Sequence, residues 1–165
     1  MRTLKRCFWI AHRARPPAFL RCRQKKGSQA IGRSRGGLST KIHALVEGLG
    51  NLARLVLTEG QAHDITQATT LLQDIDCNSV LADKAFDAND LRQNIAQRGA
   101  KAVIPPRCNR NAPPSYDTHQ YKHRNLIERH FCRIKHFRLI ATRYEKLAQR
   151  FASFIALVAA FVWLT

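Results

Sequence analysis

The sequence predicts a single α/β domain built on a mixed β-sheet, and three observations support this. Two β-rich runs, 39–47 and 52–58, flank a Gly-Leu-Gly-Asn turn that is typical of a hairpin. Short apolar runs then alternate with amphipathic segments, and two longer helical segments end the chain. Alternating strands and helices place helices on the faces of a sheet. At 165 residues the chain is long enough for one domain with its own core and too short for two comfortable ones.

The first part of the chain, residues 1–37, predicts an irregular basic arm. It is rich in Lys and Arg, has no acidic residue and shows no sustained period of 2 or 3.6. The dipeptides Pro16-Pro17 and Gly36-Gly37 interrupt it. Its apolar run Phe8-Trp9-Ile10 is too short for a signal peptide. We therefore expect a basic arm at 1–37 and the folded domain at 38–165.

After the hairpin, short strands and helices alternate as far as residue 104. Asp64 and Asp87 are suited to N-capping the two predicted helices, because short polar side chains accept hydrogen bonds from the first turn. The predicted order is a helix from Asp64 to Leu72, a strand at 79–83, a helix from Asp87 to Gly99 and a strand at 102–104.

The end of the chain predicts a long loop and two helices. Residues 105–120 are rich in Pro, Asn and Arg and read as one surface loop, and loops of that length in compact domains are usually functional or disordered. Helices are predicted at about 121–140 and 146–164. The apolar part of the last helix is shorter than the ~20 residues that cross a bilayer. We expect it to be a buried core helix.

The charge of the chain is its strongest global property. With 28 Lys and Arg against 11 Asp and Glu, the formal net charge is +17 and the isoelectric point is about 10.7. Such a surplus favours a polyanionic partner, because basic side chains that neutralise phosphates release condensed counterions. Improved solubility and attraction to a membrane surface are the alternative interpretations. Nucleic acid is the preferred one.

The five cysteines are scattered and form no Cys-x-x-Cys pair, which is typical of reduced thiols in a cytosolic protein. Four side chains could be imagined as a zinc set, but their spacing matches no standard finger and we interpret them as spectators. They are Cys108, His119, His123 and Cys132.

A row of functional side chains lies along the predicted helix 121–140. At 100° per residue, Tyr121, Arg124, Glu128 and Lys135 fall in a stripe about 60° wide, beside an apolar face. The alternative interpretation is a solvated face with an Arg–Glu pair, which is worth a few tenths of a kcal/mol, about 0.2–0.5. Periodicity alone does not decide between the two.

The spacing Tyr-x2-Arg-x3-Glu-x6-Lys of this row resembles the signature of bacterial insertion-sequence transposases that carry an Asp-Asp-Glu triad. Four further blocks resemble conserved blocks of that family and occur in the family's order. The resemblance covers about Lys25 to Thr165. The blocks are Gly32–His43, Gly60–Asp64, Ala82–Asp87 and Ile104–Arg107.

This resemblance implies an RNase H-like fold of the retroviral-integrase type and metal-dependent cleavage and transfer of DNA strands. Asp83 matches the second catalytic aspartate and Glu128 the third acidic residue, so both are expected to be catalytic metal ligands. Two Mg²⁺ or Mn²⁺ ions are implied, since hard cations prefer oxygen ligands and two ions stabilise both oxygens of an in-line displacement.

DNA is the partner that the resemblance implies, as the ends of an insertion sequence and as a target. Tyr121, Arg124 and Lys135 are expected to position phosphates beside the metal site. A homodimer, or assembly with a full-length transposase, is also expected. The protein would act in the bacterial cytoplasm at the nucleoid, without a membrane. The basic block adds three further expected DNA contacts, Arg33, Arg35 and Lys41.

The first aspartate of the family triad is missing. It normally precedes the basic Gly-rich block on a strand, whereas residues 1–37 contain no acidic residue and no recognisable central strand. Moving the reading frame back one base across the codons of Cys7–Ala11 yields Leu-Asp, followed by Ser, Arg or Cys. Our hypothesis is that residues 1 to about 24 are an out-of-frame translation; a different authentic N-terminus is the alternative.

The missing aspartate leaves two functions open. The chain is either part of a transposase whose active site is incomplete without the first aspartate, or a non-catalytic DNA-binding fragment or regulator derived from one. Ribosomal frameshifting could supply an active fusion product, and a gene remnant is equally compatible with the sequence.

Overall fold

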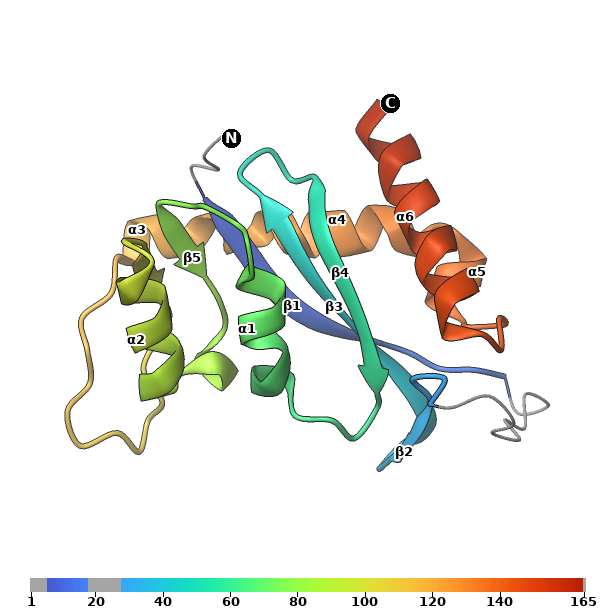
Figure 1. The fold of residues 1–165 in the computed structure, drawn as a ribbon, viewed down its shortest axis with the longest axis horizontal. Coiled ribbons are helices and arrows are strands. Elements are labelled where there is room, and N and C mark those ends of the chain that lie inside the picture. The colour runs from blue at the N-terminus through green and yellow to red at the C-terminus, as the bar shows by residue number, and fades with distance from the viewer. Residues whose placement is uncertain (1–5, 18–27, 165) are drawn as a thin grey trace.

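The fold is a mixed β-sheet with helices on both faces (Figure 1). The computed structural model describes residues 6–17 and 28–164. The long strands of a hairpin form one side of the sheet and short parallel strands form the other. The strands are β1 (Cys7–Ala14), β2 (Gly32–Ser34), β3 (Gly37–Glu47), β4 (Leu52–Glu59), β5 (Ser79–Leu81) and β6 (Lys101–Val103).

The strand order across the sheet is β4–β3–β1–β5–β6, and β2 pairs with the start of β3. β1 is antiparallel to β3 and parallel to β5, which is in turn parallel to β6. The predicted α/β class with a mixed sheet is confirmed, and this sheet agrees with the RNase H-like fold that the resemblance implies.

Two core clusters occupy the two faces of the sheet. One packs β1 residues Cys7 and Trp9 against α1 (Ala68–Leu72) and α2 (Asn89–Gln97). The other packs Phe8 of β1 against the C-terminal helices, which lie behind the sheet and beside it in Figure 1. These helices are α4 (Asn125–Lys135), α5 (Arg138–Ala141) and α6 (Ala148–Leu164).

The prediction of an irregular arm without a central strand is wrong for much of residues 1–37. β1 is the middle strand of the sheet, and β2 belongs to the same sheet, so the chain has no structural boundary at residue 37. The run Cys7–Trp9 is buried completely because helices cover both faces of the sheet. A strand buried on both faces lacks the period-2 alternation that marks half-buried strands. Residues 18–27 of the predicted arm lie outside the described residues.

The predicted helix 121–140 is divided into several shorter helices. α3 (Thr118–Tyr121) passes through the 3-10 turn Lys122–Arg124 into α4, which ends before Phe137 takes an extended conformation. The hairpin, the later strands and the other helices are confirmed within a few residues. None of the described helices is both long and apolar enough to cross a membrane.

Both predicted aspartate N-caps are wrong. Asp64 is the first residue of the 3-10 helix Asp64–Gln67, and its carboxylate instead binds the Lys41 ammonium at 2.7 Å. Asp87 precedes α2, whose first turn receives no side-chain cap. Nearby cations explain both outcomes, because a charged donor competes successfully with a helix N–H for a carboxylate.

Candidate active site

Asp83 lies at the carboxyl end of a completely buried strand, β5. Its half-buried carboxylate accepts a hydrogen bond from the Lys84 backbone N–H at 2.7 Å and so begins the 3-10 helix Lys84–Phe86. The carboxyl ends of parallel strands are where α/β sheets place their sites. Asp83 is thus fixed in backbone position and still accessible.

The row predicted on the C-terminal helix is assembled around Arg124. Its guanidinium is 2.7 Å from the Glu128 carboxylate and 5.7 Å from the centre of the Tyr121 ring. Burial raises the pKa of the Tyr121 hydroxyl, Arg124 opposes this rise, and the negative charge of Asp83 adds to it. Asp83 is therefore close enough to Tyr121 to affect it, although the two come from different elements.

Lys135 extends the row to the far end of α4. It is half-buried, and its charge acts on His12 of β1. Burial, and then Lys135, lower the pKa of His12 to about 4. Three of the four row residues, Tyr121, Arg124 and Glu128, are thus in direct contact through Arg124. Lys135 lies at the other end of α4, beside β1.

Ile10 of β1 lies on the face of the sheet that α4 covers. The parallel register pairs Phe8 with Leu81, and continuing it by two residues brings Ile10 level with Asp83. The Ile10 side chain packs into the same core cluster as Ile127 and Phe131 of α4, the helix that carries Glu128. An aliphatic side chain, Ile10, therefore stands on the face of β1 that α4 covers, in the core cluster that also contains Leu81 of β5.

The described residues contain no group of three or more His, Cys, Asp or Glu side chains that could hold a metal ion. Asp83 and Glu128 are chemically suited to Mg²⁺ or Mn²⁺, but two carboxylates do not make the donor set of a two-ion site. The suggested zinc set Cys108, His119, His123 and Cys132 is not such a group among the described residues either.

Of the three residues of the basic block that were expected to contact DNA, two are exposed to solvent, where a phosphate backbone could reach them. Arg33 and Arg35 are exposed on the β2–β3 hairpin, whose turn needs glycine at position 37, where φ is +94°. Lys41 differs, because it is buried and its ammonium is held by Asp64 at 2.7 Å and by the Ala62 carbonyl at 2.6 Å. The structure gives Lys41 a structural ion pair rather than a surface contact.

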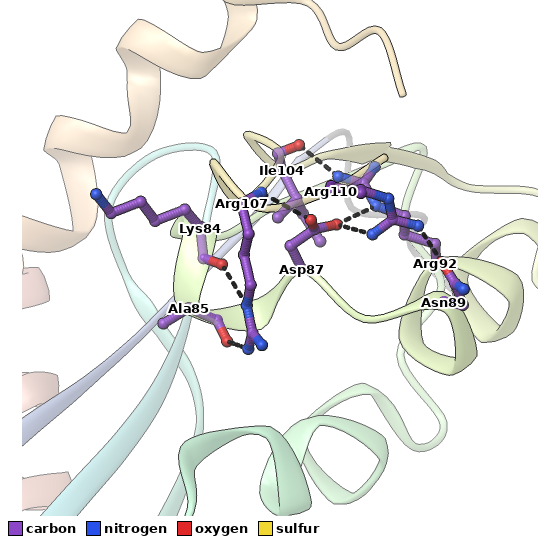
Figure 2. A network of polar contacts seen from close by, with 8 residues as sticks. All are labelled: Lys84, Ala85, Asp87, Asn89, Arg92, Ile104, Arg107 and Arg110. Atoms are coloured by element: carbon purple, nitrogen blue, oxygen red, sulfur yellow. Dashed lines mark hydrogen bonds and ion pairs between the residues drawn. The ribbon is translucent and has the colours of Figure 1, made fainter. Parts of the chain in front are cut away.

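Sequence reasoning missed the network around Asp87 (Figure 2). This carboxylate is buried and binds Arg92, Arg110 and the backbone of Arg107, so it fastens the predicted 105–120 loop beside Asp83. A signal was available in the sequence. Arg92 follows Asp87 by five residues, and Arg107 and Arg110 stand in the loop after the next strand, so all three were available as ion-pair partners.

The sheet order, with an antiparallel hairpin beside the parallel strands β1, β5 and β6, is that of an α/β domain of the RNase H-like class. Residues 12–163 match the model of the transposase DDE domain. The chain therefore belongs to the DDE transposase family, whose members act on DNA and generally depend on divalent metal ions.

Two curated relatives agree with this assignment. A candidate transposase of the insertion sequence element IS6501 from Brucella ovis is 38% identical over 129 residues, which are 77% of this chain and 99% of the relative. A candidate transposase of the element IS402 from Burkholderia cepacia is 26% identical over 147 residues, 82% of this chain and 66% of the relative. Family and relatives thus place the chain among the insertion-sequence transposases.

Proposed function

We propose that this chain serves DNA transposition by binding insertion-sequence DNA, with Asp83 and Glu128 as two of the carboxylates of a strand-cleaving site. The 165-residue chain alone binds DNA without cutting it, because the first aspartate of the triad is missing. The observation that carries the proposal is the contact of Arg124 with both Tyr121 and Glu128, with Asp83, just after β5, near enough for its charge to raise the pKa of Tyr121.

Each residue of this row has a separate role in the proposal. The Arg124 guanidinium orients the Glu128 carboxylate and adds positive charge for a phosphate. Tyr121 supplies a hydroxyl donor, and Lys135 a point charge, along the same path. A divalent cation bound by the carboxylates would supply Lewis acidity toward the scissile phosphate. Arg33 and Arg35 contribute backbone contacts further along the DNA, whereas Lys41 is no longer part of the proposal.

Position 10 is where the missing carboxylate belongs. It is level with Asp83 and faces α4, and the codon read one base back across Trp9 and Ile10 is an aspartate codon. The match to the family model begins at His12, just after this position. These facts support the out-of-frame hypothesis. The nucleotide sequence of codons 7–25 tests it directly, because the hypothesis fails if the frame shifted back by one base does not encode an Asp-Ser-Thr-like sequence.

The experiment is a nicking and strand-transfer assay on DNA that carries the element's ends, with Mg²⁺ or Mn²⁺. We expect the unmodified chain to bind this DNA without cleaving it. The substitution Ile10→Asp is expected to introduce metal-dependent nicking. Adding Glu128→Gln or Asp83→Asn to Ile10→Asp should abolish the nicking again, while DNA binding persists.

The matched control is Ile10→Asn, which has nearly the same shape as Ile10→Asp and lacks the charge. Equal nicking by both variants, or metal-dependent nicking by the unmodified chain that Asp83→Asn does not affect, contradicts the assignment of these carboxylates. Nicking by the unmodified chain that does depend on Asp83 and Glu128 contradicts the missing-carboxylate part alone.

A second function, a non-catalytic regulator, is favoured by the same incomplete donor set. Such a chain would occupy element ends or join a full-length transposase in a mixed assembly. It would act at the bacterial nucleoid in the cytoplasm. Inhibition of a complete transposase by this chain, at concentrations where Arg33→Ala/Arg35→Ala no longer inhibits, distinguishes this role from simple inactivity.

A further inference from the structure

A buried carboxylate organises the loop that follows β6. The Asp87 side chain is 1% exposed, and its oxygens lie 2.8 Å from Arg92 Nε, 2.8 Å from Arg110 Nη1 and 2.9 Å from the Arg107 backbone nitrogen. Burial alone would raise the pKa of Asp87, but these three donors together lower it. An ionised Asp87 thus holds Arg107 and Arg110 of the loop and Arg92 of α2 in one place.

Further contacts fasten the same loop to the turn after Asp83. The Arg107 guanidinium donates to the carbonyl oxygens of Lys84 and Ala85, at 3.5 and 2.8 Å. Figure 2 shows Arg107 reaching across to these carbonyls, while the Lys84 side chain points away from the network. Arg92 donates to the Ile104 carbonyl at 2.7 Å. The loop is therefore held rigidly, and such preorganisation lowers the entropic cost of binding.

The fixed loop borders a concave region of about 600 Å³. Its wall contains amide side chains from two segments, namely Asn89 at the start of α2 and Asn109 and Asn111 of the loop. Asn89 accepts a hydrogen bond from Arg110. Asn109 and Asn111 are exposed, and no other described residue hydrogen-bonds with their side chains. Two rigidly supported amides thus face solvent from a polar hollow.

We propose that the loop Arg107–Ala112 is a base-reading element, in which Asn109 and Asn111 contact base edges next to the strand break. This inference rests on the proposed function, because it places DNA at Asp83, four residues before Asp87 in the chain. The amide of asparagine offers a donor and an acceptor side by side, which matches the adenine edge in the major groove.

The chemistry of the loop favours bases over phosphates. The guanidiniums of Arg107 and Arg110 are occupied by Asp87, Asn89 and backbone carbonyls, so they support the loop. The polar groups left at its surface are the neutral amides of Asn109 and Asn111 and the Cys108 thiol, and neutral amides release no counterions from DNA. Neutral contacts contribute to sequence preference without adding to the salt dependence of binding.

The experiment uses the full chain and two duplexes. One is the best binder selected from a library of random-sequence duplexes, and the other is its scrambled version. Dissociation constants are measured without divalent metal between about 50 and 200 mM KCl, a range over which phosphate contacts change affinity strongly. We expect Asn109→Ala/Asn111→Ala to weaken binding to the selected duplex about 10-fold or more. Binding to the scrambled duplex and the salt slope should stay unchanged.

Gln93→Ala is the matched control, since it removes an exposed amide from α2 outside the hollow and should change nothing. Asp87→Asn should reproduce the loss of preference by loosening the loop, and thermal unfolding reports whether that variant still folds. The two asparagine substitutions are at exposed positions, so they test the inference even if Asp87→Asn does not fold.

Other outcomes overturn the inference. Equal weakening on both duplexes with a shallower salt slope would make the loop a phosphate contact. An unchanged preference would leave it without a role in recognition. The assay does not depend on cleavage, so absence of nicking by Ile10→Asp does not affect it. Failure of the chain to bind either duplex would overturn the proposed function and this inference together.

Discussion

At the residue scale, His43 illustrates how a buried polar group makes this fold sensitive to acid. It lies on β3 with no exposed surface, and Thr58 Oγ1 is 2.7 Å from its Nε2. Burial, partly opposed by Asp64 and reinforced by Lys41, lowers its pKa to about 4. The folded protein therefore keeps His43 neutral at pH values where an unfolded histidine, with a pKa of about 6.5, takes up a proton.

We accordingly predict that the free energy of unfolding decreases as the pH falls from about 6.5 toward 4. The sign follows from proton uptake, because the unfolded chain binds more protons than the folded one in this interval. His43→Gln should flatten the profile by up to about 2 kcal/mol, while exposed His136→Gln should leave it unchanged. Urea denaturation at a series of pH values measures both. Parallel profiles for His43→Gln and the parent chain would contradict this assignment.

Site residues differ in how far the sequence reveals them. Asp83 could be placed because it directly follows a short apolar strand, and Glu128 because it shares a helical stripe with Arg124. Lys41 could not, since its partner Asp64 is distant in the sequence and the ion pair exists only once β3 and the 3-10 helix pack together. The prediction for Asp87 was wrong for the same reason. An aspartate can cap a helix locally or form an ion pair with distant residues, and the sequence does not distinguish the two.

At the element scale, Arg143 joins three segments that are far apart in the chain. It is completely buried, with Nη2 2.8 Å from the Gln29 carbonyl, Nη1 3.1 Å from the Ala30 carbonyl and further donation to Thr40 of β3. Its guanidinium also lies 5.0 Å from the centre of the Phe151 ring of α6. One side chain thereby connects the approach to the β2–β3 hairpin with the last helix.

We predict that Arg143→Lys destabilises the fold by about 2–3 kcal/mol, because a lysine ammonium cannot reproduce the planar fork of donors and leaves buried carbonyls unpaired. Amide hydrogen exchange should accelerate most in the segment 28–40. The exposed α4 substitution Arg133→Lys is the control and should change neither measurement. Uniform acceleration over the whole chain would argue against this local anchoring role.

The strands show where prediction of elements from the sequence succeeds and fails. The hairpin 39–58 was predictable, because its turn residues and strand composition are local signals. β1 was not predictable, because it is a short apolar run bounded by arginines, and only its pairing with β3 and β5 in the folded chain makes it a strand. β1 also fits its surroundings imperfectly: within the described part of the chain, the buried Trp9 Nε1 has no hydrogen-bond partner. Buried donors are normally paired, so this indole N–H is an exception, together with the ring nitrogens His43 Nδ1 and His130 Nε2 elsewhere in the described residues.

At the scale of the whole molecule, the last helix, α6, is apolar on both its buried and its exposed side. α6 buries one side, with Phe151 and Ile155, as the core-helix prediction expected. Its other side exposes several large apolar residues toward the C-terminal end, which extends away from the sheet in Figure 1. Exposed apolar patches commonly mark association surfaces, so the proposed assembly with a second transposase chain has a surface available to it. The exposed residues are Leu157, Phe161, Trp163 and Leu164.

The net charge of +17 predicts how the whole molecule responds to salt on DNA. The logarithm of the binding constant should fall linearly with the logarithm of salt concentration, with a slope of about −0.9 for each phosphate neutralised. Arg33→Ala and Arg35→Ala should each make this slope shallower by about 1, because both side chains are exposed on the hairpin. Arg150→Ala, an exposed charge on α6, is the control. If all three variants change the slope equally, the charge acts as a diffuse field. If only the hairpin variants do, the DNA follows the β2–β3 end of the sheet, which is continuous through β3 and β1 with the row at Asp83 and Glu128.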